Sequence, residues 1–352
     1  MTFDDAMHTL VAAVAPTHPH AAAAATERHG QLVKPPGSLG RLEAVGAQLA
    51  AIAGTCPPPV PVRAAVVVVA ADHGVHDQKV TPWPQQITTV MVEQFCAGTA
   101  AVNALAATVG ASVNVLDVGC AVEPADHTLL RKRRVRAGTA DLSVGDAMSR
   151  DDATRAFLAG AGVADELIGD GVDLLVTGDM GIANTTASAC LIGAFTGADA
   201  AHVTGRGTGI DDDTLAHKQQ VVGAALDRHD ADPDDALGTL AAVGGLEHAA
   251  LAGLICSAAV HRVPIVLDGV VTNAAALAAA ALCPRVVGYL IAGHRSPEPA
   301  AAIALATLGV VPLLDLELCL GEGTGGLLAV PLVTAAARAL AQMTTLAELG
   351  FA

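Results

Sequence analysis

The chain has 352 residues, of which 52% are hydrophobic, 2% are aromatic and 15% are charged. Its formal net charge is −16, from 19 basic and 35 acidic residues, whereas a nucleic-acid-binding protein needs the opposite balance. The seven cysteines include no CxxC pair, which indicates buried thiols in a reducing cytoplasm. We expect no secretion signal and no membrane span, because the longest uncharged window, 94–116, divides into a helix, a turn and a strand.

Both ends of the chain have helical composition, at residues 2–53 and 332–349. We predict that residues 1–53 and 332–352 form one small helical domain. Residues 54–331 are predicted to form a single large α/β domain, because the chain contains no Pro/Ser-rich linker and no repeat of solenoid period.

In the predicted large domain, short β-branched runs repeatedly end in loops that carry Gly, Asp or His. Six runs have this form: 65–69, 113–116, 172–176, 264–267, 286–291 and 310–318. They lack strict alternation, which is typical of strands buried on both faces of a parallel sheet. Helical stretches lie between them, for example at 90–109, 152–169 and 246–260. The pattern predicts an open, mostly parallel, Rossmann-like α/β sheet with flanking helices and with all six loops at one rim.

The most informative loop is Leu320-Gly-Glu-Gly-Thr-Gly-Gly326, which places one carboxylate, Glu322, among four glycines and a threonine. Glycine lets the backbone approach a ligand closely and present bare N–H groups. The segment alone fits a flexible surface turn with a solvated Glu322 equally well. The recurrence of similar loops after the other apolar runs favours a binding site.

A phosphate bound by so acidic a chain has to be held by local features. The sequence Gly205-Arg-Gly-Thr-Gly209 is suited to a backbone nest for an anion, and Lys218 and Arg295 are cations in the same set of motifs. The basic cluster 131–134 is short and isolated, and we interpret it as a solvated loop or a strand edge.

Seven motifs follow one another over nearly the whole chain: Lys34-Pro-Pro-Gly-Ser-Leu-Gly-Arg-Leu-Glu43, Ala71-Asp-His-Gly-Val75, Gly178-Asp-Met-Gly-Ile-Ala-Asn-Thr-Thr186, Gly207-Thr-Gly-Ile-Asp-Asp212, Leu267-Asp-Gly269, Gly293-His-Arg-Ser296 and Leu320-Gly-Glu-Gly-Thr-Gly325. Each motif by itself is weak evidence of a family relationship. In this order they resemble the nicotinate-nucleotide:dimethylbenzimidazole phosphoribosyltransferase family, which makes the lower-ligand nucleotide of cobalamin.

The resemblance implies a reaction of nicotinate mononucleotide with 5,6-dimethylbenzimidazole that gives nicotinate and α-ribazole 5′-phosphate with inversion at the anomeric carbon. The pyridinium leaving group becomes neutral as its bond breaks, so the reaction needs no general acid. The benzimidazole loses one N–H proton, so one positioned carboxylate is sufficient. We therefore expect no metal and no cofactor, and the 13 histidines show no HExxH or paired metal-ligand spacing.

Two carboxylates are the candidate catalytic residues. Glu322 matches the family's catalytic base, and partial desolvation among glycines would suit a proton acceptor. Asp179 matches a position where relatives carry Glu or Asp, and the resemblance implies that it stabilises positive charge on the ribosyl group or holds a hydroxyl. The alternative for Asp179 is a helix cap.

The candidate nucleotide-binding residues share a place in the glycine-rich or hydroxyl-bearing motifs. Lys218 matches the family's phosphate-contacting lysine, with a solvated helical lysine as the alternative, and Ser296 is a candidate hydrogen-bond donor to phosphate or ribose. Thr185 and Thr186 are equally ordinary first-turn residues of a helix. The remaining candidates are Gly181, Asn184, Gly207, Thr208, His294, Arg295, Gly321, Gly323 and Thr324.

The predicted pocket for the base departs from the family pattern. Trp83 and Met91 stand where some relatives have a small polar residue and Gln, and Met180 follows Asp179. A flat indole and two thioethers suit stacking on a planar ring, although Met91 also fits a buried helix face. If these residues line the pocket, specificity for the benzimidazole would be loose.

A non-catalytic nucleotide- or ribazole-binding protein on the same scaffold is the alternative function, and a pure binder has no need of a buried base. A dinucleotide-dependent oxidoreductase is disfavoured because no GxGxxG follows the first strand with an acidic residue about twenty positions later. We expect small-molecule substrates, a cytoplasmic location and no nucleic-acid or membrane partner. The resemblance implies a homodimer.

Overall fold

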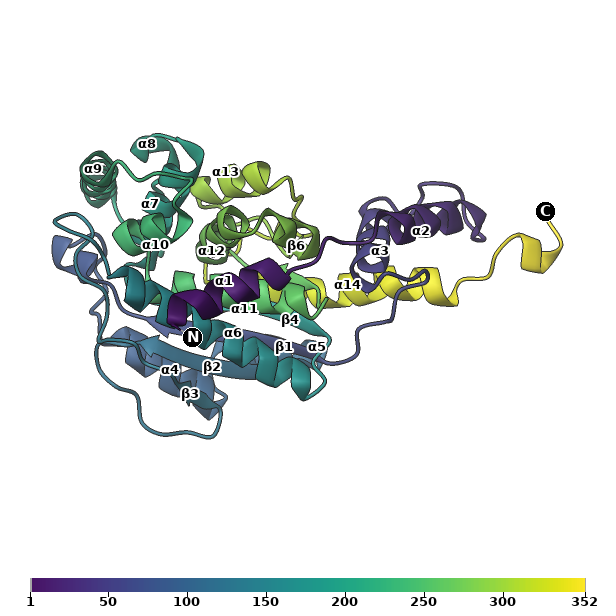
Figure 1. Ribbon diagram of the computed structural model, residues 1–352, viewed down its shortest axis with the longest axis horizontal. Helices are drawn as coiled ribbons and strands as arrows, with labels where there is room; N and C mark the ends of the chain where they lie inside the picture. The colour runs from purple at the N-terminus through teal and green to yellow at the C-terminus, as the bar shows by residue number, and fades with distance from the viewer. Residues whose placement is uncertain (1, 352) are drawn as a thin grey trace.

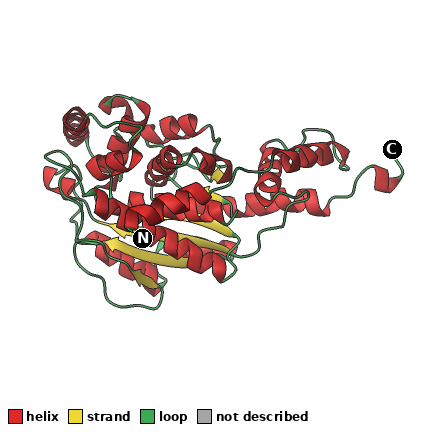
Figure 2. Cartoon of the chain, viewed as in Figure 1, coloured by secondary structure: helices red, strands yellow, loops and turns green. Residues whose placement is uncertain are grey.

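The computed structural model describes residues 2–351 and shows an α/β unit from which a helical arm extends (Figures 1 and 2). The strands are β1 (Ala64–Ala71), β2 (Ser112–Gly119), β3 (Leu130–Lys132), β4 (Leu174–Met180), β5 (Ile265–Leu267) and β6 (Leu290–Ala292). They form one parallel sheet in the order β3-β2-β1-β4-β5-β6. The predicted fold class, an open parallel α/β sheet, is confirmed.

The helices account for most of the remaining structure. In chain order they are α1 (Phe3–Ala13), α2 (Pro19–Gln31), α3 (Arg41–Ala53), η1 (Gly74–Gln78), α4 (Ile87–Ala97), α5 (Ala101–Val109), α6 (Arg150–Gly169), α7 (Asn184–Thr196), α8 (Ala200–Val203), α9 (Asp212–His229), α10 (Ala236–Val243), α11 (Leu246–Val260), α12 (Val270–Leu282), η2 (Pro284–Tyr289), α13 (Pro299–Leu308), α14 (Thr324–Gln342) and η3 (Ala347–Leu349).

Strand β1 shows why its sequence does not alternate in polarity. Ala65, Val67 and Val69 face one hydrophobic core, with α6, α11 and α12, while Val66 and Val68 face a second core with α4, α5 and α14. All five side chains are fully buried. Both faces of the sheet are therefore covered by helices, as the apolar runs predict.

Helices α6 and α11 pack at very short range on one of these faces. A Cβ atom added at Gly160 would lie 1.8 Å from the carbonyl oxygen of Ala250, and one added at Gly253 would lie 1.8 Å from that of Phe157. Both glycines are therefore required for this backbone contact. Helix α6 begins with a capping box in which Ser149 accepts from the Asp152 amide, and it ends at Gly169 as the predicted helix does.

Three predicted elements differ from the structure. The run 286–291 lies mostly in η2, and only Leu290 and Ile291 belong to strand β6. The run 310–318 is not a strand, because it makes only a single bridge, between Leu314 and His294, beside β6. The sixth strand is instead β3, in the basic cluster, where Arg131 lies 3.0 Å from Glu166 of α6. The predicted helix 90–109 is divided into α4 and α5 by Gly98, whose φ of 78° ends α4. A left-handed glycine is a common helix terminator.

The helical arm consists of α2, α3 and the C-terminal part of α14 (Figure 1). Its small core contains Ala21, Ala25, Ala50 and Leu340. Helix α1, which the sequence assigns to the small helical domain, packs on α6 and α11 of the α/β unit. The two-domain division remains a prediction.

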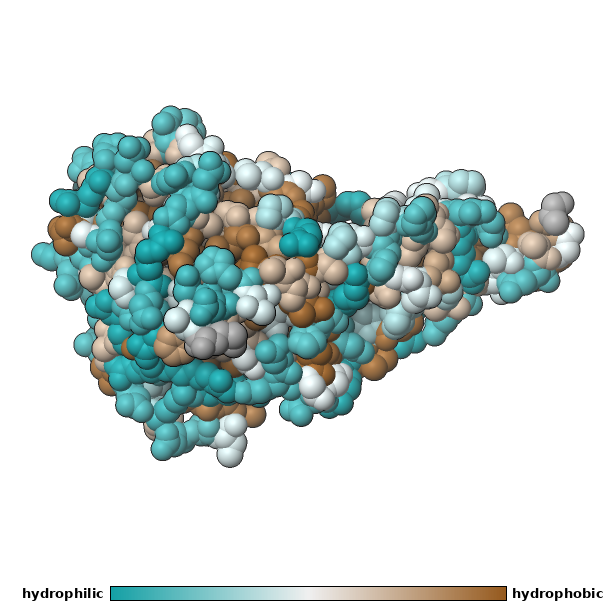
Figure 3. Space-filling model, in the orientation of Figure 1, coloured by the Kyte–Doolittle hydropathy of each residue, from teal (hydrophilic) through white to brown (hydrophobic). Residues whose placement is uncertain are grey.

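Two apolar stretches, Ile87–Val109 and Thr324–Gln342, have the length and composition of a membrane-crossing helix. The first is divided into α4 and α5, and the second packs against α3, α5, β4 and β5. Hydrophilic residues dominate the face of the α/β unit shown in Figure 3, with hydrophobic residues in smaller patches. Both stretches thus take part in the packing of the α/β unit.

Candidate active site

The sheet order creates a crevice between β1 and β4. From β1 the chain proceeds to β2 and β3 on one side, and from β4 to β5 and β6 on the other. Such a reversal of strand order is where ligands bind in open α/β sheets, outside the carboxyl ends of the strands. Asp179 lies near the end of β4, Asp268 follows β5 and His294 follows β6. The chain topology therefore collects these polar side chains at one rim, as predicted.

Side chains and glycines from several of these loops line a continuous cleft at the rim. Its lining residues include Trp83, Asp179, Met180, Gly181, Asn184, Thr185, Thr186, Gly207, Thr208, Lys218, His294, Ser296, Glu298, Leu320 and Gly321. Most of the residues predicted from the sequence line this cleft, whereas five of them do not: Met91, Arg295, Glu322, Gly323 and Thr324. Among residues 2–351, no group of three or more His, Cys, Asp or Glu side chains is placed to hold a metal ion.

The loop before α14 holds Glu322 in an unusual backbone conformation. Glu322 has φ = 63°, between Gly321 at 83° and Gly323 at 89°. A left-handed conformation costs a non-glycine residue on the order of 1 kcal/mol, and such strain concentrates at functional sites. The loop lies directly on β4, since a Cβ atom added at Gly178 would be 2.6 Å from the Glu322 carbonyl oxygen.

Asp268, which follows β5, holds the Glu322 loop through hydrogen bonds to its backbone. Its carboxylate accepts hydrogen bonds from the amides of Gly323, at 3.0 Å, and Gly326, at 2.9 Å. A carboxylate at the N-terminus of α14 is favoured by the helix dipole and by the unpaired amides of the first turn. Nε2 of His294 lies 3.3 Å from Oδ1 of Asp268 on the other side. Burial disfavours the charged imidazole, but the contact with Asp268 raises the pKa of His294 overall.

The Glu322 carboxylate is buried, with 4% of the residue exposed. Its Oε2 accepts one hydrogen bond, of 3.3 Å, from the Val102 amide in the first turn of α5. Burial raises the pKa of Glu322, the Val102 bond opposes this shift, and the charge of Asp268 adds to it. The result is a carboxylate with a single amide donor and an increased affinity for a proton, which is what a general base requires.

Asp179 is also buried and lies beside the Glu322 loop. A Cβ atom added at Gly321 would be 3.4 Å from each Asp179 carboxylate oxygen. Burial, with a contribution from the charge of Asp268, raises the pKa of Asp179 to about 8. Asn184 Nδ2 donates a 2.9 Å hydrogen bond to Asp179 Oδ2, which acts in the opposite direction. Asp179 therefore accepts from a side chain of α7 and does not cap that helix through its own side chain.

Lys218 lies on the opposite side of the cleft. Its Nζ donates to Thr185 Oγ1 at 2.8 Å and to the Gly205 carbonyl at 3.3 Å, and the residue is 2% exposed. Burial lowers the pKa of Lys218 to about 8, although the charge of Glu298 partly offsets this shift. Lys218 is therefore a buried lysine and not the solvated helical lysine of the alternative prediction.

The glycine-rich loop 205–209 lies between Lys218 and Glu298. Glu298 Oε1 accepts a 2.7 Å hydrogen bond from the Gly207 amide, so a carboxylate occupies one donor of the predicted nest. Arg206, in the same loop, pairs with Asp212 of α9 and donates to the carbonyl of Ile210, just before that helix. Ser296 Oγ accepts from the Glu298 amide at 3.3 Å and lines the cleft.

Trp83 lies against this glycine-rich loop. Its indole Nε1 donates to Thr208 Oγ1 at 3.0 Å, and the residue remains 47% exposed. Met180 lines the cleft, whereas Met91 packs against the core that contains α4 and α5 and is not among the lining residues. Arg295 is exposed and lies 3.3 Å from Asp315. The binding roles predicted for Trp83, Met91 and Arg295 remain predictions.

Sequence reasoning did not select Asp268 and Glu298 as site residues. Asp268 belongs to the motif Leu267-Asp-Gly269 and follows a buried strand, which is a usable signal. Glu298 lies two residues after Ser296, but only the structure shows that it contacts the Gly207 amide. A contact between residues 91 positions apart has no local signal in the sequence.

Comparison with known proteins gives consistent matches along the chain. A phosphoribosyltransferase family model matches residues 14–350. The nicotinate-nucleotide–dimethylbenzimidazole phosphoribosyltransferase of Salinispora tropica is 53% identical, covering 97% of this chain and 98% of the relative, and that of Chloroflexus aggregans is 50% identical, covering 96% and 95%. The crystal structure of the Thermus thermophilus enzyme of the same name superposes with a TM-score of 0.90 at 45% identity, covering 95% of this chain and 99% of that one.

Proposed function

Because the chain belongs to the nicotinate-nucleotide–dimethylbenzimidazole phosphoribosyltransferase family, we propose that Glu322 is the general base of its phosphoribosyl transfer, from nicotinate mononucleotide to 5,6-dimethylbenzimidazole. The observation that carries this assignment is the buried Glu322 carboxylate, held by a strained glycine-rich loop and accepting only the Val102 amide. The reaction belongs to the synthesis of the cobalamin lower ligand.

The chemistry uses one proton acceptor. A benzimidazole nitrogen forms a bond to the anomeric carbon as the bond to the nicotinate nitrogen breaks, and the bonding electron pair neutralises the pyridinium. The second benzimidazole nitrogen loses its proton to Glu322. Attack on the face opposite the leaving group gives the inverted α-anomer. The raised pKa of Glu322 favours this proton transfer.

Asp179 has an electrostatic role in this proposal. The pyridinium ring and the ribosyl carbon carry positive charge before and during bond breaking. A carboxylate whose pKa is about 8 in the free protein becomes ionised when such a cation lies beside it, and it then stabilises that cation. Asn184 orients Asp179 through its 2.9 Å hydrogen bond.

The nucleotide phosphate is assigned to the opposite side of the cleft. Lys218 supplies a buried positive charge, and the phosphate dianion keeps it protonated by raising its pKa from about 8. Thr185, Thr186, Thr208 and Ser296 offer hydroxyl donors nearby, and Gly207, whose amide donates to Glu298, lines the same part of the cleft. The N-terminus of α7 adds the dipole of a 13-residue helix. Gly181 and His294 also line the cleft, and Gly323 and Thr324 follow the lining residue Gly321 at the start of α14.

Trp83 and Met180 are assigned to the acceptor base; Met91, predicted from the sequence for the same role, packs against the core that contains α4 and α5 and does not line the cleft. The exposed indole of Trp83 is available for stacking, and the thioether of Met180 lines the cleft. Such a pocket makes few polar contacts and therefore discriminates weakly among substituted benzimidazoles.

The protein is further proposed to be a soluble cytoplasmic homodimer with small-molecule substrates and no nucleic-acid or membrane partner. The net charge of −16 supports the absence of nucleic-acid binding. The small helical domain is proposed to comprise residues 1–53 and 332–352, with the packing of α1 on the α/β unit as an exception within it.

Nicotinate release separates this function from non-catalytic nucleotide binding. The purified chain should release nicotinate from nicotinate mononucleotide only when a benzimidazole is present, with an equal amount of α-ribazole phosphate formed. Binding of both substrates, measured by calorimetry, without any nicotinate release would instead identify a binding protein.

A further inference from the structure

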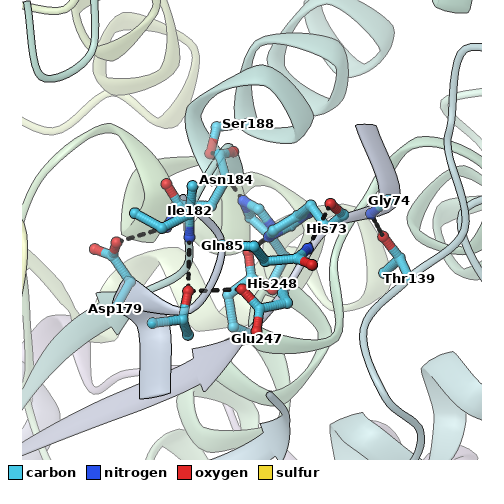
Figure 4. A network of polar contacts seen from close by, with 12 residues as sticks. His73, Gly74, Gln85, Thr139, Asp179, Ile182, Asn184, Ser188, Glu247 and His248 are labelled. Atoms are coloured by element: carbon cyan, nitrogen blue, oxygen red, sulfur yellow. Dashed lines mark hydrogen bonds and ion pairs between the residues drawn. The ribbon is translucent and has the colours of Figure 1, made fainter. Parts of the chain in front are cut away.

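Behind the cleft lies a cluster of four fully buried polar side chains, His73, Glu247, His248 and Ser188, which we call the buried cluster (Figure 4). Glu247 Oε1 lies 2.8 Å from His73 Nε2 and 2.9 Å from His248 Nδ1. His248 Nε2 lies 2.8 Å from Ser188 Oγ. Glu247 of α11 thus contacts His73, which follows β1, and its neighbour His248, and His248 extends the connection to Ser188 of α7. None of the four residues lines the cleft.

The buried cluster carries charge. Burial by itself raises the pKa of Glu247, but the charges of His73 and His248 hold it far below its usual range. Burial likewise opposes the charged form of His73, and Glu247 raises the pKa of His73 overall. A buried ion pair is seldom a net source of stability, because well-packed apolar side chains of similar volume often do as well or better. Its presence behind a cleft therefore calls for a functional explanation.

The hydroxyl of Ser188 links the buried cluster to the residue that binds Asp179. Ser188 Oγ lies 2.9 Å from the Asn184 carbonyl oxygen, and Asn184 Nδ2 donates to Asp179. When the Ser188 proton points to that carbonyl, His248 Nε2 has to donate to Ser188 Oγ, which ties α7 to α11 at the turn that carries Asn184.

The loop between β4 and α7 is held from a second direction. The Ile182 amide donates to Thr88 Oγ1 at 3.1 Å, and Thr88 donates to the Asp72 carboxylate at 2.6 Å. Gly181 packs so tightly that an added Cβ atom would lie 2.3 Å from the Ala71 carbonyl and 3.4 Å from His73 Nε2. The position of Asn184 is therefore determined by contacts behind the cleft.

We propose that the buried cluster is a positioning device that keeps the Asn184 amide on Asp179 and thereby keeps Asp179 ionised during phosphoribosyl transfer. This inference rests on the proposed electrostatic role of Asp179. Ser188 and His248 act through Asn184 and touch no substrate.

The charged groups around Asp179 determine the direction of the expected effect. Asp268, Glu247 and Glu322 are the carboxylates whose charge raises the pKa of Asp179, while His294 lies on Asp268 and His73 lies on Glu247. The Asn184 bond lowers this pKa. Loss of that bond leaves the carboxylates unopposed, so the pKa of Asp179 should rise above about 8.

The test is the pH dependence of kcat/KM for nicotinate mononucleotide in the Ser188→Ala protein, because kcat/KM reports the ionisations of the free enzyme. Since ionised Asp179 is the active form in this proposal, kcat/KM should rise with pH as Asp179 loses its proton. In the variant this ascending limb should move to higher pH by about one unit, so that kcat/KM falls about tenfold on the acid side of the limb and recovers at higher pH. A merely structural role would lower the melting temperature without moving the limb. His248→Gln should shift the limb in the same direction, and it provides a second variant if one of the two fails to fold.

Two further proteins complete the experiment. Ser257→Ala is the matched control, because Ser257 is also buried on α11 but donates to Asp165 at 2.5 Å, away from the cleft. The ascending limb of its pH profile should not move. Asp179→Asn should abolish the limb. An Asp179→Asn protein with the wild-type profile overturns the proposed role of Asp179 itself. If Asp179→Asn abolishes the limb while Ser188→Ala and His248→Gln leave it unmoved, only the positioning role is rejected.

Discussion

The two sides of the cleft differ in the charge that they bury. On the side of the Glu322 loop, which we call the acidic side, Asp179, Asp268 and Glu322 lie together, and the pKa values of Asp179 and Glu322 are raised. On the side of the loop 205–209, the basic side, Lys218 is the buried cation and its pKa is lowered to about 8. Burial makes each group easier to neutralise, so both sides hold groups that respond strongly to a charged ligand.

The two sides are also built differently. The acidic side is fixed by backbone amides, since Gly323 and Gly326 donate to Asp268 and Val102 donates to Glu322. The basic side also contains a carboxylate bonded to a backbone amide, Glu298 with Gly207, but its charged group Lys218 donates to the Thr185 hydroxyl and to the Gly205 carbonyl. We infer that the acidic side governs the chemical step, and that the basic side governs nucleotide binding.

The largest expected effect comes from Glu322→Gln. Glutamine keeps the shape and hydrogen-bonding reach of the side chain but accepts no proton, so kcat should fall by about 10²- to 10⁴-fold. KM for nicotinate mononucleotide should stay within a few-fold. Steady-state nicotinate release, with separate binding measurements for both substrates, checks this result. Wild-type turnover would reject Glu322 as the base, and loss of binding together with rate would make it a positioning residue.

A smaller effect is expected from Lys218→Ala on the basic side. Loss of the buried ammonium should raise KM for nicotinate mononucleotide by tens-fold, on the order of 2 kcal/mol, with a smaller change in kcat. Lys132→Ala is the matched control, because Lys132 lies in β3 and pairs with Glu123 and Asp126 instead of lining the cleft. An unchanged KM would remove Lys218 from the site.

The smallest effect is expected from Trp83→Ala. Loss of stacking should raise KM for dimethylbenzimidazole about fivefold to tenfold and leave KM for the nucleotide nearly unchanged. Trp83→Phe keeps a ring but loses the bond to Thr208, so it should retain most of the affinity for the base. A rise in the nucleotide KM alone would assign Trp83 to the basic side. Quenching of the fluorescence of this sole tryptophan by the base gives an independent readout.

On each side of the cleft the sequence missed one carboxylate, Asp268 on the acidic side and Glu298 on the basic side, but only Asp268 has a local signal in the sequence. The Glu322 loop is a contiguous run after an apolar segment, and the ends of parallel strands necessarily meet at one rim, so the neighbourhood of Asp179 and Glu322 follows from local patterns. Glu298 and Gly207 are brought together by folding over 91 positions, a contact that no periodicity records. The buried cluster is hidden for the same reason, since 174 positions separate His73 from Glu247.

Local sequence patterns likewise predicted only part of the fold. Runs 65–69 and 172–176 became central strands because their alternate residues bury on two faces. The run 310–318 has a similar composition at its start but lies beside β6, where only a single bridge forms. Leu313 of this run is buried, whereas Val311 and Leu316 are exposed, and no second strand extends the ladder. An apolar composition alone therefore determined neither burial nor strand formation, which depended on the available pairing partners.

The most direct test of the difference between the two sides is a double-mutant cycle on kcat/KM for nicotinate mononucleotide with Glu322→Gln, Lys218→Ala and the combined protein. If the acidic side acts on the chemical step and the basic side on nucleotide binding, the two fold-losses should multiply in the double variant to within about threefold. A double variant no slower than Glu322→Gln alone would show that both residues serve one interaction, and would contradict the separation of roles.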